Sequence, residues 1–241
     1  MKRVLFILSV LVLFLGQSGV VSGQHRTRIV PHDLSPADYK QMDRNVRITV
    51  DLLNNNIRNM ADREKKNRER YKRSAEDLFI GKCLQFPEII KDSSGRIIKI
   101  ITNRGVTMEL ATLYKQRKYT RLMREYFTNV LNFKYETVHI AFSDIADMKM
   151  SRPNYIGTDE DGNDMYECTV TYIQYFKGIT KENIICEDLT TKTIKVQVTE
   201  YFEPNFATGQ LEPCYQVLLG NVYVDKIEEA DIETIFELNL N

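Results

Sequence analysis

Three long segments of alternating apolar and polar residues occupy the last third of the chain. They begin at Tyr166 and read YECTVTYIQYFKG, IICEDLTTKTIKVQVTEYF and CYQVLLGNVYVD, with short breaks between them. Successive side chains of a strand point to opposite faces, so a period of two indicates strands with one buried face. We therefore expect neighbouring strands of one antiparallel sheet, with the earlier helical segments covering its apolar face.

The same alternation predicts which side chains face the core. The inward set of the first segment is Tyr166, Cys168, Val170, Tyr172, Gln174 and Phe176. The inward set of the second is Ile194, Val196, Val198 and Phe202. Gly220 interrupts the third segment, and a glycine inside a strand predicts a bend or a bulge. A bent sheet wrapped around a helix forms a cone, and a cone leaves a pocket.

A helix is predicted to begin at Ser35-Pro36-Ala37-Asp38. Serine is a good N-cap, proline fits the first helical position, and Asp38 lies three residues after the cap. An apolar stripe at helical spacing follows: Tyr39, Met42, Val46, Val50, Leu53, Ile57 and Met60. The stripe thins over residues 61–70 and resumes at Tyr71. Residues 36–80 are thus either one long helix or two helices that meet near residues 59–62.

Shorter elements are expected between these two regions. A hairpin is predicted from residues 87–90 and 96–102, a short strand at 106–110, a helix over 115–132 and a strand over 136–144. Asp161-Gly162 is typical of a tight hairpin turn. A calcium site built from the acidic residues of this turn is disfavoured, because counting from Asp159 places Asp164 and Val170 where an EF-hand loop needs glycine and glutamate.

The N-terminus predicts export. Lys2 and Arg3 precede an apolar run from Val4 to Leu15, followed by small and polar residues, which is the pattern of a secretory signal peptide over residues 1–23. Residues 24–35 are expected to be a flexible leader, 36–227 one domain and 228–241 an acidic tail. The mature chain is expected to be periplasmic or extracellular, with no transmembrane segment after signal cleavage.

Composition and motifs exclude several functions. Lys plus Arg and Asp plus Glu number 33 each, so the chain has no net charge that would attract nucleic acid. No phosphate-binding loop, dinucleotide fingerprint, zinc-protease motif or nucleophile elbow occurs. We therefore expect no cofactor and no metal. The four cysteines, Cys83, Cys168, Cys186 and Cys214, allow disulfides or free buried thiols. His139 lies at an outward position of its predicted strand and lacks an orienting carboxylate, which argues against a general base.

The order of a helix, a hairpin, a helix and long antiparallel strands resembles the NTF2-like, or cystatin-like, α+β fold. The residues that carry this resemblance are the helical segment 36–80 and the strand runs VHI, YIQYF, TKTIKV and LLGNVYV between Val138 and Val224. The same runs are similar to uncharacterised exported proteins of the Bacteroidota. The resemblance implies a long N-terminal helical segment on a curved antiparallel sheet. It does not imply one activity, because this fold carries isomerases, dehydratases and ligand-free scaffolds.

Two hypotheses for the function follow. We favour a non-enzymatic binding or assembly module of the cell envelope, which contacts a protein partner through its tyrosine-rich sheet or through a basic helix. The candidate partner-binding residues are Arg63, Lys65, Lys66, Arg70, Lys72 and Arg73. The alternative is a pocket protein, either a small-ligand carrier or an enzyme of the isomerase or dehydratase type. Its candidate ligand residues are Tyr172, Gln174 and Glu200. A homodimer is left open.

Overall fold

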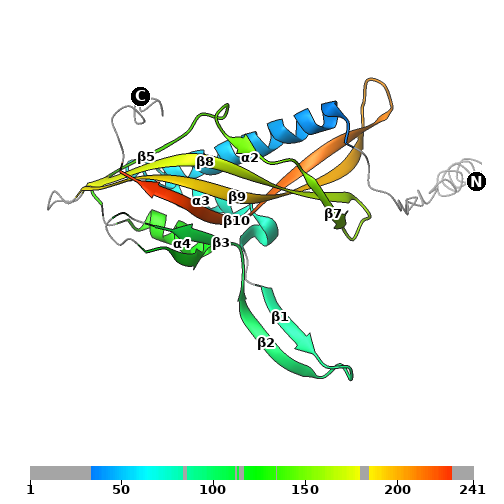
Figure 1. The fold of residues 1–241 in the computed structure, drawn as a ribbon, viewed down its shortest axis with the longest axis horizontal. Helices are drawn as coiled ribbons and strands as arrows, with labels where there is room; N and C mark the ends of the chain where they lie inside the picture. The colour runs from blue at the N-terminus through cyan, green and yellow to red at the C-terminus, as the bar shows by residue number, and fades with distance from the viewer. Residues whose placement is uncertain are drawn as a thin grey trace, which may run out of the picture.

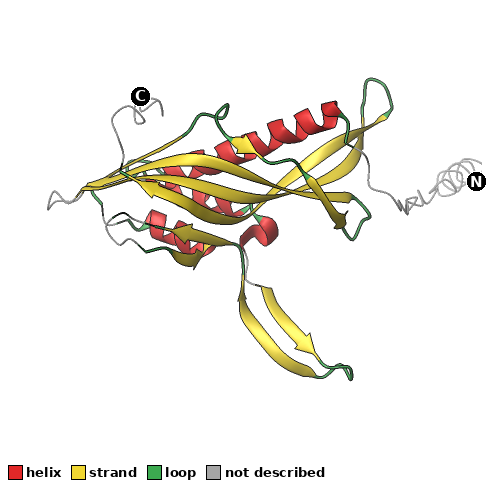
Figure 2. Cartoon of the chain, in the orientation of Figure 1, coloured by secondary structure: helices red, strands yellow, loops and turns green. Residues whose placement is uncertain are grey.

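Residues 34–83, 86–111, 113, 117–133, 135–179 and 185–229 are described by a computed structural model of the chain. The predicted signal peptide, most of the predicted leader and nearly all of the acidic tail lie outside these ranges, so their assignments stay predictions. The described part has the expected α+β architecture, with a long N-terminal helix packed on a mostly antiparallel sheet (Figures 1 and 2).

Within the described residues, one large sheet and three α-helices form the body of the fold. The helices are α2 (Pro36–Ala61), α3 (Arg68–Glu76) and α4 (Met123–Leu131), with a short 3-10 turn η1 (Ile80–Cys83). The strands are β1 (Phe86–Lys91), β2 (Ile97–Arg104), β3 (Thr107–Leu110), β4 (Tyr119–Leu122), β5 (Thr137–Phe142), β6 (Lys149–Met150), β7 (Asn154–Thr158), β8 (Asp164–Ile179), β9 (Ile185–Pro204) and β10 (Leu211–Glu228).

The strand order of the eight-stranded sheet is β4-β3-β10-β9-β8-β5, and β6 and β7 also pair with β8. Every neighbouring pair is antiparallel except β10 and β3, which run parallel. Strands β1 and β2 form a separate hairpin that projects from the body, as Figure 1 shows. The predicted hairpin and the predicted strands at residues 106–110 and 136–144 are therefore confirmed.

The three long segments form β8, β9 and β10, as their alternation predicts. In the β8–β9 pair, Cys168 lies opposite Val196. In the β9–β10 pair, the register shifts between Leu219 and Val222, so the predicted irregularity at Gly220 is confirmed. The inward prediction for Phe202 is wrong, because this side chain is 44% exposed. The pairing of β8 with β9 begins at Met165 opposite Thr199, so Phe202 lies on a part of β9 that projects past β8.

Helix α2 begins where its capping residues predict. The Ser35 hydroxyl accepts a hydrogen bond from the Asp38 N–H at 3.2 Å, and the Asp38 carboxylate accepts one from the Ser35 N–H at 2.9 Å. This reciprocal pair satisfies N–H groups that have no partner within the helix. The side chains of the predicted stripe are buried at Met42, Val46, Val50, Leu53, Ile57 and Met60.

Replacing the cap tests how much this helix start contributes. We expect Ser35→Ala to lower the free energy of unfolding by about 1 kcal/mol, because it removes the acceptor for the Asp38 N–H. Ser35→Asn keeps an N-cap acceptor and serves as the control. Chemical denaturation of the three proteins measures the difference. An equal loss in both variants would contradict the capping argument.

Two helices, rather than one, span residues 36–80. Helix α2 ends at Ala61, Asp62 is extended, and Asn67 has a left-handed backbone with φ of 61° before α3 begins. The Arg68 Nε–H donates to the Met60 carbonyl oxygen at 2.6 Å, which ties the start of α3 to the end of α2. The polar stretch over residues 61–70 therefore corresponds to a break in the helix.

The prediction of a helix over residues 115–132 is correct only for its second half. Residues Tyr119–Leu122 form β4, which pairs with β3 from Thr107 opposite Leu122 to Leu110 opposite Tyr119. Helix α4 starts only at Met123. The helical spacing of the apolar side chains continues through both elements, so periodicity alone does not mark the change from strand to helix.

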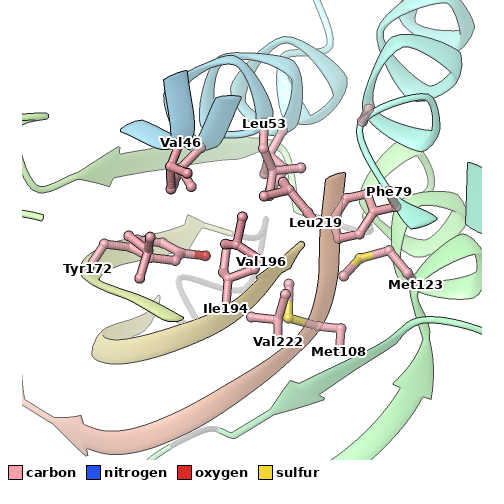
Figure 3. Close-up of a cluster of buried hydrophobic side chains, with 14 of the residues drawn as sticks. Val46, Leu53, Phe79, Met108, Met123, Tyr172, Ile194, Val196, Leu219 and Val222 are labelled. Atoms are coloured by element: carbon pink, nitrogen blue, oxygen red, sulfur yellow. The ribbon is translucent and has the colours of Figure 1, made fainter. Parts of the chain in front are cut away.

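The core lies between the sheet and the helices. Figure 3 shows Val46 and Leu53 of α2 above Val196, with side chains of β3, β8, β9 and β10 completing the cluster. These side chains are buried, and the core continues to Phe127 of α4. The long strands extend beyond this apolar cluster, and the candidate site lies on that extension.

Candidate functional site

A cavity of about 340 Å³ lies between α4, the β3–β4 pair and the long strands β8 and β9. It is lined by Leu110, Ala111, Tyr119, Arg121, Tyr126, Asn129, Phe133, Tyr135, Gln174, Phe176, Asp188, Thr190 and Lys192. Sites for small organic ligands have volumes of about 300 to 1,000 Å³ and mostly apolar walls. The mixture of aromatic, aliphatic and polar side chains in this lining fits that description.

Strands β8 and β9 supply the polar side of the cavity. Gln174 is opposite Thr190 in the register, and Lys192 lies two residues further along β9. All three side chains are buried and occupy the same face of the sheet as Ile194, because the strand period is two. The inward face is thus apolar beneath α2 and becomes polar at the end that α4 covers.

Lys192 is the most unusual residue of the site. Its side chain is 4% exposed, and its Nζ donates to Gln174 Oε1 at 2.5 Å. Burial lowers the pKa of this amine from 10.5 to about 8, because removal from water disfavours the charged form. Gln174 is the only hydrogen-bond partner of Lys192 within the described residues, and it carries no charge.

Other lysines of the same strands have carboxylate partners. Lys195 lies on the opposite face, with its Nζ 3.5 Å from Glu167 Oε1, and Lys177 is 3.4 Å from Glu187 Oε1. Both side chains are far more exposed than Lys192. The most deeply buried of these three lysines is therefore the one whose hydrogen-bond partner is a neutral amide.

Backbone contacts fix the rest of the polar side. The Thr190 hydroxyl donates to the Gln174 carbonyl oxygen at 3.2 Å across the β8–β9 pair. The buried Asp188 carboxylate accepts from the Leu113 N–H at 3.1 Å, which attaches the connection between β3 and β4 to the sheet. These contacts hold the polar groups on rigid strands, as a binding site requires.

Three aromatic rings form an apolar wall of the cavity, and one of them, Phe176, follows Gln174 on the same face of β8. Phe133, Tyr135 and Phe176 pack edge to face, with ring centroids 5.6 to 5.9 Å apart. Such edge-to-face pairs stabilise one another beyond their buried area. The Tyr126 hydroxyl also belongs to the cavity, and burial raises its pKa. The wall is therefore pre-formed, and it offers an apolar surface to a ligand.

The aromatic wall depends on Gly178. A Cβ at this position would lie 2.7 Å from Cδ1 of Tyr135, closer than side chains approach one another. We expect Gly178→Ala to lower the free energy of unfolding by about 2 kcal/mol, since Tyr135 must leave its place. Denaturation of the single variant and of the Gly178→Ala, Tyr135→Ala pair measures this. If Tyr135 is not the obstacle, the two losses will simply add.

The three predicted pocket residues lie in different places. Only Gln174 lines the cavity. Tyr172 is buried in the core, its ring is 6.0 Å from that of Phe142, and its hydroxyl has no hydrogen-bond partner among the described residues. Glu200 lies eight residues along β9 from Lys192, roughly 26 Å away along the strand. There it is buried, and its Oε2 accepts from the Tyr166 hydroxyl at 3.4 Å.

Sequence reasoning missed Lys192 and Asp188. Both have the same parity in β9 as Ile194 and Val196, which the alternation correctly places inward. Extending that alternation towards the start of the segment would have placed a lysine and an aspartate on the buried face. A charged residue at an inward position was the signal in the sequence.

The predicted basic residues surround the break between α2 and α3. Five of them are exposed and Lys72 is half-buried; the exposed ones are Arg63, Lys65, Lys66, Arg70 and Arg73. The Arg63 guanidinium donates to the carbonyl oxygen of Phe133, which attaches the break to the end of α4. At least this arginine therefore has a structural contact within the chain.

The remaining predicted chemistry can also be placed. His139 is exposed on β5, at the outward position predicted for it. Asp159 accepts from the Asp161 and Asn163 N–H groups, as in a hairpin turn, and the described residues contain no cluster of metal-ligating side chains. Cys83, Cys168 and Cys214 are free thiols, while the Cys186 side chain lies outside the described part.

No family model, curated protein or solved structure matches this chain. The α+β assignment therefore depends on the strand pairing and helix packing described above. Within the described ranges, no helix has both the length and the apolar character needed to span a membrane.

Proposed function

We propose that this protein binds a small organic ligand in the cavity, with a carboxylate or similar anionic group of the ligand against Lys192. The observation that carries the proposal is a buried ammonium group whose described partner is a neutral amide. A buried charge is costly unless an opposite charge or several hydrogen bonds compensate it. An anionic ligand would supply that compensation.

The rest of the cavity supports the same ligand class. Lys192 uses one of its three donors on Gln174, so further donors are available to a carboxylate. The aromatic wall of Phe133, Tyr135 and Phe176 suits a ring or a short hydrocarbon. An amphipathic carboxylate small enough for about 340 Å³ would contact both sides.

This proposal favours the pocket protein over the envelope binding module. A pocket between a helix and the inward face of a sheet is also what the NTF2-like assignment implies, so that finer fold assignment belongs to the same proposal. Export and a protein partner stay predictions. The exposed basic residues agree with partner binding, but a solvated basic face is common in soluble domains.

Ligand-observed NMR and calorimetry with benzoate as the probe test the proposal. We expect benzoate to bind the wild-type protein and the Lys195→Met variant equally, and to bind the Lys192→Met variant at least about tenfold more weakly. Lys195 is the matched control because it lies three residues away on the opposite face. Equal affinity in all three proteins, or no binding to any of them, would overturn the proposal.

A further inference from the structure

We propose that the Lys192 amine is a nucleophile that forms an imine with an aldehyde or ketone held in the cavity. This inference rests on the proposed function, because the carbonyl compound must first occupy the same space. It goes further in assigning the site a covalent reaction and a substrate class.

The contacts of Lys192 suit a nucleophile better than a structural cation. A carboxylate partner favours the charged form of an amine, whereas the Gln174 amide oxygen accepts one N–H without adding a charge. The 2.5 Å hydrogen bond fixes the direction of the amine on a rigid strand pair. Desolvation in an apolar pocket is one way in which proteins activate lysine.

The protonation equilibrium supports this geometry. With burial lowering the Lys192 pKa to about 8, roughly a tenth of the molecules carry the neutral amine near pH 7. An exposed lysine with an ordinary pKa carries it in fewer than about one molecule in a thousand. Lys192 should therefore react much faster than the surface lysines at neutral pH.

The cavity supplies the second requirement, which is a place for the carbonyl compound. The aromatic wall can hold the hydrocarbon part of an aldehyde while its carbonyl carbon meets the amine. Such positioning turns a reaction between two molecules into one within a single complex. A small aromatic or branched aldehyde fits both the volume and the wall.

The reaction balances without a further reagent. The Nζ lone pair attacks the carbonyl carbon, and the resulting carbinolamine loses its oxygen as water, which takes both protons of the neutral amine. A C=N bond replaces the C=O bond, and no electrons enter or leave. Hydrolysis reverses the step, so the imine can act as a reversible covalent hold on the ligand or as an electron sink at the adjacent carbon.

Reductive trapping tests the inference. The purified protein is incubated with benzaldehyde and sodium cyanoborohydride near pH 7, which converts an imine into a stable benzylamine, and peptide mass mapping gives the labelling rate at each lysine. We expect Lys192 to be labelled at least about tenfold faster than Lys195, and excess benzoate to slow labelling at Lys192 alone. Lys195→Met, on the opposite face of β9, should leave the labelling rate at Lys192 unchanged.

The outcomes separate this inference from the proposed function. Uniform labelling of all lysines, with benzoate still bound, would overturn the imine and leave the ligand pocket. Fast labelling of Lys192 without any benzoate binding would support the imine and overturn the carboxylate proposal. If neither probe engages Lys192, both fail. Competition by benzoate uses the wild-type protein, so this arm does not depend on a variant that folds.

Discussion

Replacing Lys192 with methionine is expected to stabilise the fold by about 2 kcal/mol near pH 7. The cost of burying the amine, estimated from the lowering of its pKa from 10.5 to about 8, is about 3 kcal/mol at neutral pH. Methionine removes this cost and fills a similar volume, while Gln174 loses one hydrogen-bond donor, which costs about 1 kcal/mol. The result would be a more stable protein with an impaired site.

The stability of the wild-type protein depends on pH because the Lys192 pKa is lower in the folded protein than in the unfolded chain. Between pH 8 and 10.5 the unfolded chain keeps the Lys192 proton that the folded protein has released, so the stability of the wild-type protein rises with pH in this window. The free-energy cost of burying the charged Lys192 amine is fully present below about pH 8. The difference in unfolding free energy between the two proteins should fall by about 2 kcal/mol from near pH 7 to near pH 9.5.

Urea denaturation across this pH range measures the difference, with Lys195→Met as the control. The buried tyrosines Tyr126 and Tyr172 have raised pKa values, so both proteins lose stability above about pH 10, but that loss cancels in the comparison. The control should show only a small difference, because Lys195 is 45% exposed and an exposed ion pair contributes little to stability. A difference for Lys192→Met that is independent of pH would contradict the account of this buried amine.

The long strands could be predicted because each has one buried and one half-exposed face. Tyr166, Cys168, Val170 and Tyr172 alternate with polar residues over most of β8, and no helical pattern fits that spacing. The start of α2 could be predicted for a similarly local reason, since Ser35 and Asp38 contain the whole capping interaction. In both regions, residues close together in the sequence are enough to determine the element.

The strand β4 could not be predicted in this way. Tyr119 and Leu122 continue the spacing of α4, and the strand exists because it pairs with β3, which itself pairs in parallel with β10. That pairing joins segments more than 100 residues apart, as Met108 opposite Val222 shows. A pattern read along the chain does not reveal such a contact.

The cavity illustrates the same limit. The alternation placed Gln174, Tyr172 and Glu200 on one face, and all three are indeed buried. It could not show that α2 covers the face near Glu200 while α4 leaves a space above Gln174. Parity within a strand was therefore enough to find the buried polar residues, but the position of the helices decides which of them face a cavity.

Replacing Phe127 with alanine is expected to lower the free energy of unfolding by about 3 to 5 kcal/mol. This ring is fully buried, and it packs against Phe79 at 5.9 Å and Tyr126 at 5.6 Å between ring centroids. Its loss removes the transfer free energy of the ring and leaves a void where α4 meets the core. For a chain of this size the melting temperature should fall by roughly 10 °C.

The same substitution tests whether α4 holds the cavity in shape. Tyr126 and Asn129 of α4 line the cavity, so loosening the helix should also weaken benzoate binding, even though Phe127 is not among the lining residues. Glu125→Ala is the matched control, because Glu125 is exposed on the same helix and should change stability by less than about 0.5 kcal/mol. A folded Phe127→Ala protein that keeps full benzoate affinity would show that the sheet alone shapes the site, and that α4 only covers it.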